Sequence, residues 1–168
     1  MPKKPPADGA SPAAARERAL RLLGIRPRGR EELGRALTDR GFEPGAVAVA
    51  LERLAEEGWL DELGAARSTV RVRAGRYGPR RIERELISRG FPKEVVDAAL
   101  SERDPEVEER TLRRALEKIW KKHATLPAAE RRRRVLDSLA RRGFATAKVS
   151  EMIDRLSHEI ERGPRALS

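Results

Sequence analysis

Apolar residues recur along this chain at intervals of three and four positions, the spacing that places side chains on one face of a helix. The clearest runs are Val47, Ala50, Leu51 and Leu54, then Val95, Val96, Ala99 and Leu100, then Val149, Met152, Ile153 and Leu156. Each run starts a few residues after a phenylalanine, and the chain has only 3 phenylalanines. The pattern predicts an all-α protein in which similar helices return at regular intervals.

The same three-residue phrase, Arg-Gly-Phe, precedes each of these runs. It occurs at residues 40–42, 89–91 and 142–144, at intervals of roughly 50 residues, which indicates an internal repeat. A glycine at the end of an apolar helix supplies the left-handed position that stops the helix, and the next residue can pack back on the last turn. We therefore predict these structural anchors of the repeats: Gly41, Phe42, Gly90, Phe91, Gly143 and Phe144, with Trp59 after Gly58.

Start and stop signals divide the chain into three similar units. Ser11-Pro12, Asp61 and Asp104-Pro105 are predicted helix starts, and glycines or Gly-Pro pairs separate the helices that follow. We expect an elongated array of three tandem three-helix repeats of helix-turn-helix type. The predicted segments are a flexible basic tail at 1–10, repeats at 11–60, 61–103 and 104–162, and a C-terminal tail at 163–168.

Composition fits a helical array and indicates the kind of partner. Aromatic residues make up 4% and hydrophobic residues 39% of 168 residues, which favours many small interfaces over one large core. The net charge is +10 and the isoelectric point is about 10.9. Such a balance favours a polyanion or an acidic protein surface as partner.

The positive charge is concentrated in two places. Between residues 64 and 91 the arginines far outnumber the acids, which are Glu83 and Glu85. Arg80 and Arg81 lie just inside a helix N-terminus, where the helix dipole disfavours cations. They could serve an external anion, or the two glutamates could simply offset them. The candidate contacts to such a partner are Arg67, Arg71, Arg73, Arg76, Arg80, Arg81 and Arg84, then Lys121, Lys122, Arg131, Arg132, Arg133, Arg134 and Arg141.

Catalytic and metal-binding signatures are missing from the sequence. There is no Gly-rich phosphate loop and no dinucleotide motif, and His123 and His158 stand in polar helical settings typical of surface histidines. We predict no enzyme activity and no cofactor. The absence of cysteine fits a reducing compartment, and no signal peptide or membrane-spanning stretch is predicted, so we expect a cytoplasmic protein.

Several segments together resemble the RecX regulatory proteins of bacteria. The most specific are Gly58-Trp59-Leu60-Asp61 and Gly78-Pro79-Arg80-Arg81-Ile82, supported by Arg30-Glu31-Glu32-Leu33 and by Ala19-Leu20-Arg21-Leu22-Leu23. The resemblance extends from about residue 14 to residue 160. Two departures concern local packing: Gly64 stands in a helix that it is expected to weaken, and Gly29 replaces the serine that commonly caps the next helix.

The resemblance implies a role in DNA repair, recombination and the SOS response. Proteins of this family bind the RecA filament on single-stranded DNA and suppress filament growth, ATP hydrolysis, strand exchange and coprotease activity, without a catalytic site. We expect a monomer that also binds double-stranded DNA weakly and without sequence preference. A generic helix-turn-helix DNA-binding protein or transcription regulator is the alternative, and an enzyme with an unrecognised site is a third possibility.

Overall fold

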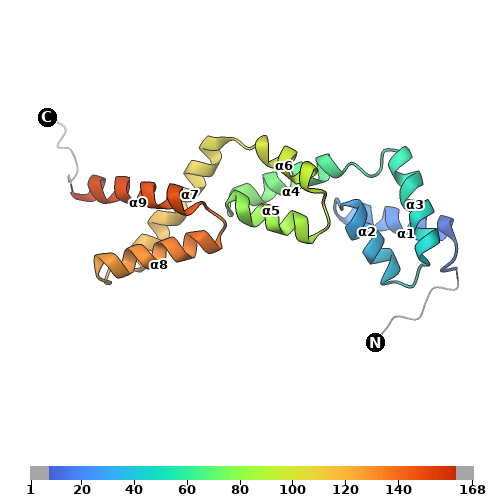
Figure 1. The fold of residues 1–168 in the computed structure, drawn as a ribbon, viewed down its shortest axis with the longest axis horizontal. Coiled ribbons are helices and arrows are strands. Elements are labelled where there is room, and N and C mark those ends of the chain that lie inside the picture. The colour runs from blue at the N-terminus through green and yellow to red at the C-terminus, as the bar shows by residue number, and fades with distance from the viewer. Residues whose placement is uncertain (1–7, 162–168) are drawn as a thin grey trace. The chain divides into compact units, whose positions relative to one another are not determined.

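The structure, a computed structural model, describes residues 8–161, and the side chains of residues 8–157. Within that range it contains helices and no strand, which confirms the all-α prediction (Figure 1). Most of the predicted tails, residues 1–7 and 163–168, and the side chain of His158 lie outside the described residues. The helices are α1 Pro12–Ile25, α2 Arg30–Thr38, α3 Pro44–Glu56, α4 Glu62–Ala74, α5 Pro79–Ser88, α6 Lys93–Ser101, α7 Pro105–Lys122, α8 Ala128–Arg141 and α9 Thr146–Glu161.

Contacts divide the chain into two units. The first unit consists of the residues up to Val70 together with residues 85–102, and the second consists of residues 71–84 together with those from Arg103 onward. The division passes through α4 and α5, so each unit combines one complete outer set of three helices with part of the middle set.

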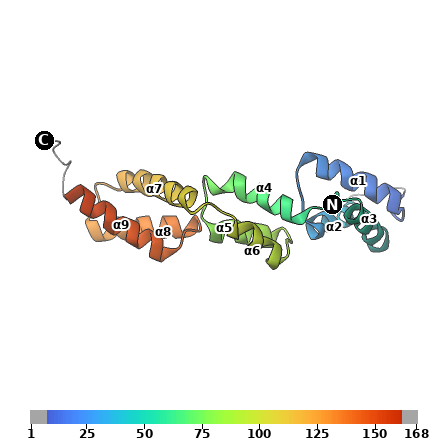
Figure 2. The ribbon, with the colours of Figure 1, turned by 90° about the horizontal axis from the view of Figure 1, so that it is seen from above.

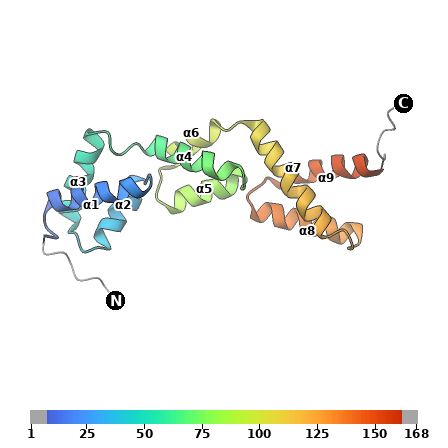
Figure 3. The same ribbon diagram turned by 180° about the vertical axis from the view of Figure 1, so that it is seen from behind.

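In the first unit, α1, α2 and α3 pack on one another around a small apolar core (Figure 3). α1 and α3 make the most extensive contact, and α2 packs against both. The buried side chains of α3 include the predicted apolar run Val47, Ala50, Leu51 and Leu54, so burial follows the predicted helix face. The core residues are Ala15, Ala19, Leu22, Leu33, Leu37, Phe42, Val47, Ala50, Leu51 and Leu54.

In the second unit, α7, α8 and α9 form the corresponding bundle (Figure 2). Val135 and Leu139 of α8 are completely buried, and Ile153 of α9 is nearly so. The core again has few aromatic groups, with Phe144 inside it and Trp120 at its edge. The full set is Leu112, Ala115, Leu116, Ile119, Val135, Leu139, Phe144, Val149 and Ile153.

The three Arg-Gly-Phe corners have the predicted geometry. Gly41, Gly90 and Gly143 adopt positive φ angles of 89°, 82° and 88°. At each corner the phenylalanine N–H donates to the carbonyl of the leucine five residues earlier, at 3.1–3.3 Å, closing the helix end as a Schellman motif. The three phenylalanines are 7%, 3% and 1% exposed. All three rings are therefore buried at their corners.

The corner at Gly58 and Trp59 differs from the three Arg-Gly-Phe corners in the exposure of its aromatic side chain. Gly58 has a φ of 75°, and the Trp59 N–H donates to the Leu54 carbonyl at 2.8 Å, so this corner repeats the backbone motif of the other three. The indole, however, is 57% exposed. The backbone motif anchors this corner, while the side chain after the glycine stays in contact with solvent.

The helix caps explain the two departures at Gly64 and Gly29. Asp61 Oδ1 accepts a hydrogen bond from the Gly64 N–H at 2.7 Å, and a Cβ on residue 64 would collide with that carboxylate. Gly64 therefore leaves room for the Asp61 carboxylate that caps α4. At α2, where Gly29 offers no capping side chain, Glu62 Oε1 accepts a hydrogen bond from the Arg30 N–H at 2.7 Å, so this free donor of the helix start has a partner.

Candidate nucleic-acid interface

In the second unit, the start of α5 meets the corner after α8 through its main chain. The Gly78 N–H donates to the Arg142 carbonyl at 2.9 Å, and the Arg80 N–H donates to the Gly143 carbonyl at 3.2 Å. Helix N-termini have free N–H donors and helix C-termini have free carbonyls, so the two ends satisfy each other. We call this contact, made by residues 76–81 and 141–144, the second joint.

Glycine is required on both sides of the second joint. A Cβ on Gly78 would lie 2.5 Å from the carbonyl carbon of Gly143, and a Cβ on Gly143 would lie 2.5 Å from the Cβ of Arg81. Backbone meets backbone here with no room for a side chain. The positions of the flanking arginines are therefore set by rigid main-chain contacts.

The second joint brings together arginines that have no acidic partner. Arg76, Arg80, Arg81 and Arg141 are exposed, Arg142 is half-buried, and none of them forms an ion pair within the described part of the chain. Arg76 and Arg81 lie over the ring of Tyr77, with guanidinium carbons 5.3 Å and 4.2 Å from its centre. Like charges gathered without counter-charges favour an external anion.

At the contact between the first two helix sets, which we call the first joint, the arginines have an acidic partner. This joint lies wholly within the first unit, where three arginines converge on Glu32. Arg28 Nη1 lies 2.6 Å from one carboxylate oxygen and Arg89 Nε lies 3.1 Å from the other, while Arg26 forms a third ion pair. Arg89 also donates to the Pro27 carbonyl at 3.1 Å. These arginines hold the structure together and are not available to a ligand.

Glu32 is the acidic centre of the first joint, and its side chain is 14% exposed. Burial raises its pKa, but the hydrogen bonds and charges of Arg26 and Arg89 together outweigh burial, so the pKa lies below the usual value. A carboxylate with a depressed pKa contributes stability that is present above its unfolded pKa. That contribution is lost as the pH falls from about 4.3 through the lower folded value.

Replacing Glu32 by glutamine is expected to lower the free energy of unfolding by about 2 kcal/mol at pH 7, because three arginines lose their shared counter-charge. Urea denaturation measures the loss. Glu31→Gln is the matched control, since Glu31 is 65% exposed and lies 3.7 Å from Arg35, and its effect should stay within about 0.5 kcal/mol. Equal effects of the two variants would contradict the role given to Glu32.

The other arginines predicted in the middle region differ in availability. Arg67 is paired with Glu102, and Arg73 is half-buried and engaged in the fold. Arg71 is exposed with no ion pair among the described residues, and Arg84 donates only to the Arg80 carbonyl at 3.2 Å. The structure thus separates free from occupied cations within a cluster that looks uniform in sequence.

The basic cluster of the third repeat is also divided. Arg132 bonds Ser150 at 2.6 Å and pairs with Asp154, Arg134 pairs with Glu130 at 2.8 Å, and Arg131 stacks on Trp120 at 4.5 Å. Three remain exposed with no ion pair in the described range: Lys121, Lys122 and Arg133.

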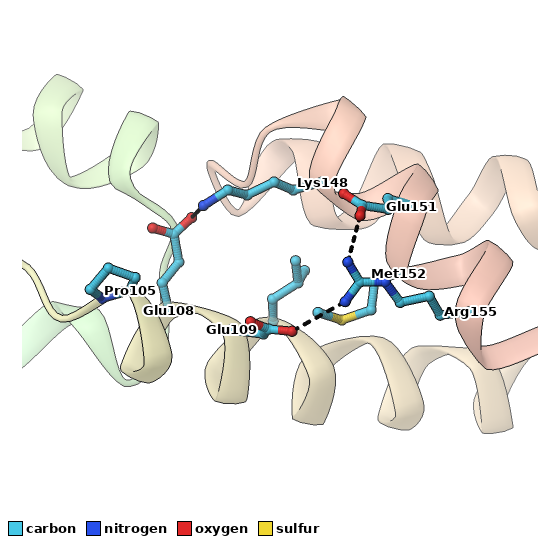
Figure 4. Close-up of a pocket in the computed structure, with 8 residues that line it drawn as sticks. Pro105, Glu108, Glu109, Lys148, Glu151, Met152 and Arg155 are labelled. Atoms are coloured by element: carbon cyan, nitrogen blue, oxygen red, sulfur yellow. Dashed lines mark hydrogen bonds and ion pairs between the residues drawn. The ribbon is translucent and has the colours of Figure 1, made fainter. Parts of the chain in front are cut away.

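A cavity of about 200 Å³ lies between α7 and α9, and its charges are already paired (Figure 4). Lys148 Nζ lies 3.3 Å from Glu108, and Arg155 bridges Glu109 and Glu151 across the opening. The cations at its rim therefore have acidic partners, unlike the exposed arginines of the second joint. Within residues 8–157 no group of three or more His, Asp or Glu side chains could hold a metal ion.

Comparison with known proteins identifies the family. Models of the first, second and third three-helix domains of RecX match residues 15–54, 61–100 and 106–153. The chain belongs to the RecX family. It is 41% identical to the regulatory protein RecX of Halorhodospira halophila over 158 residues, which are 93% of this chain and 96% of that protein. It is also 41% identical to RecX of Xanthomonas axonopodis pv. citri over 130 residues, covering 76% and 78% of the two chains.

Solved structures give the same result for the fold. The crystal structure of RecX from Lactobacillus salivarius matches with a TM-score of 0.79 at 18% identity, covering 92% of this chain and all of that one. A second RecX crystal structure matches with a TM-score of 0.77 at 25% identity, covering 86% and 71% of the two chains. The predicted resemblance to RecX is thereby confirmed. No described helix is long and apolar enough to cross a membrane.

Proposed function

We propose that this RecX-family chain binds the RecA filament on single-stranded DNA and lowers its activity. It acts by binding alone, and the affected activities are filament growth, ATP hydrolysis, strand exchange and coprotease function. The observation that carries the proposal is the cluster of arginines without acidic partners at the second joint. A filament on DNA offers both a phosphate backbone and a protein surface to such a regulator.

Phosphate is the ligand that best fits the second joint. Arginine guanidinium groups match phosphate geometry, and neutralising several phosphates releases the counterions condensed on DNA. Both hydrogen bonds across the joint are made by main-chain atoms, so the guanidinium groups are not needed to hold it together. We assign Arg76, Arg80, Arg81, Arg141 and Arg142 to phosphate contacts.

Binding to DNA is expected to be independent of sequence. The residues that read adenine by paired hydrogen bonds are asparagine and glutamine, and this chain contains neither. The aromatic ring at the second joint, Tyr77, is already in contact with the guanidinium groups of Arg76 and Arg81. This composition supports a filament regulator over the alternative of a sequence-specific helix-turn-helix repressor.

The free protein is expected to bind single-stranded DNA with a strong salt dependence. If about five phosphates are neutralised, affinity should fall roughly 100-fold between 50 mM and 200 mM salt. Fluorescence anisotropy with two oligonucleotides of unrelated sequence measures both the salt dependence and the specificity. An affinity that stays constant across this salt range, or that differs by orders of magnitude between the sequences, would contradict the assignment.

A further inference from the structure

The exposed indole of Trp59 requires an explanation of its own. Four corners of this chain share one backbone motif, and in three of them the aromatic ring after the glycine is at most 7% exposed. At the fourth corner the ring is 57% exposed, although tryptophan has more apolar surface to bury. The fold does not use this side chain as it uses the phenylalanines.

A hollow of about 510 Å³ lies beside the indole, entirely within the first unit. α1 supplies Leu20 and Leu23 to its wall, and the start of α4 supplies Ala65. Ile25, which follows the lining residue Gly24 in sequence, is 75% exposed. Apolar surface gathered beside an exposed tryptophan is typical of a site that buries a partner's side chain.

The two charged side chains that line the hollow, Asp61 and Arg28, already have partners. Asp61 caps the Gly64 N–H at 2.7 Å, and Arg28 donates to the Leu22 carbonyl at 3.5 Å and to Glu32 at 2.6 Å. A nucleobase carries several donors and acceptors on its edges, and burial here would leave them unpaired at a substantial cost. An aliphatic or aromatic side chain has no such cost. The lining therefore favours a protein partner.

The charges around the hollow lead to the same conclusion. Arg28 is the one cation among the residues that line the hollow, and its guanidinium is paired with Glu32 at 2.6 Å. At the second joint the arginines have no acidic partner. A neutralised surface does not attract a polyanion, but it is complementary to an uncharged anchor side chain set among polar residues of a protein.

We propose that the hollow beside Trp59 is a docking site for an apolar side chain of a protein partner. This inference rests on the proposed function, which makes that partner a RecA subunit of the filament. The two units then have separate tasks: the first contacts protein through Trp59, and the second contacts phosphate through the arginines of the second joint.

Two variants test the docking site in complementary ways. Trp59→Ala removes the indole, and Gly24→Leu fills the hollow from its edge, where a Cβ has nothing within 4 Å. Each is expected to weaken binding to RecA-coated single-stranded DNA about 10-fold or more, as loss of a buried aromatic anchor does. Affinity for bare single-stranded DNA should stay within about twofold, because the phosphate contacts are untouched. Val49→Ala, at an apolar residue that is 42% exposed outside the hollow, should change neither affinity.

The outcomes separate the docking site from the proposed function. Wild-type protein that binds coated DNA no better than bare DNA would overturn the proposed function and the docking site with it. If the wild-type protein prefers coated to bare DNA and both variants keep that preference, the docking site alone would be overturned. Equal losses on bare and coated DNA in Trp59→Ala would assign the indole to a nucleobase and also overturn it. Circular dichroism and urea denaturation confirm that each variant is folded.

Discussion

Reversing the charge of Arg76, Arg80 and Arg141 is expected to abolish the inhibition of RecA that we propose for this protein. These three exposed arginines come from both sides of the second joint and have no ion pair among the described residues. Glutamates in their places would repel phosphate, so affinity for single-stranded DNA should fall about 100-fold or more at low salt. Anisotropy measures the binding, and strand exchange by RecA measures the inhibition.

A matched control keeps the change in net charge and alters only its position. Arg110, Arg113 and Arg155 are also exposed and lie in the second unit, but they pair with Glu106, Glu117 and Glu109 at 3.0–3.5 Å. Because these arginines are already paired, their reversal to glutamate should weaken DNA binding less than reversal at the second joint. The fold should be retained, since exposed ion pairs contribute little to stability. Equal losses in the two triple variants would show that only the total charge matters.

Gly143→Ala is expected to lower the free energy of unfolding by about 3 kcal/mol or more. The residue has a φ of 88°, which costs an L side chain about 1 kcal/mol or more. Its Cβ would also lie 2.5 Å from that of Arg81, and relieving this overlap requires movement of packed backbone at a further cost of about 1–3 kcal/mol. Urea denaturation measures the change.

Gly58→Ala is the control for Gly143→Ala. Gly58 has a φ of 75° but nothing within 4 Å of an added Cβ, so only the conformational cost of about 1 kcal/mol applies. The stability that Gly143→Ala loses beyond the loss in Gly58→Ala is the contribution of close packing at the second joint. If both variants lose the same stability, close packing at the joint is not needed.

The local features of the fold could be predicted from the sequence because each depends on a few neighbouring residues. A glycine after an apolar run gives the left-handed stop wherever it occurs, and Ser11, Asp61 and Asp104 all cap helices as expected. Burial depends on distant segments. Trp59 and Phe91 follow glycines in the same backbone motif, yet only Phe91 is covered by the fold.

The candidate site could be predicted in outline, but its availability to a ligand could not. Arginine density located the basic region, whereas ion pairing depends on residues far along the chain: Arg67 pairs with Glu102 and Arg89 with Glu32. The second joint has no sequence signature, because it is made by main-chain atoms of residues more than 60 positions apart, Gly78 and Arg142 among them. Two clusters that look separate in sequence therefore meet in the structure.

Titration of the protein into a RecA ATPase assay on single-stranded DNA tests the central claim most directly. RecA hydrolyses ATP when assembled on DNA, so a protein that binds the filament and limits its growth should lower the steady-state rate. We expect the rate to fall progressively as the protein is added and to level off at a fixed ratio of protein to RecA. A rate that stays unchanged with the protein in molar excess over RecA, under salt conditions where it binds the DNA, would contradict the account.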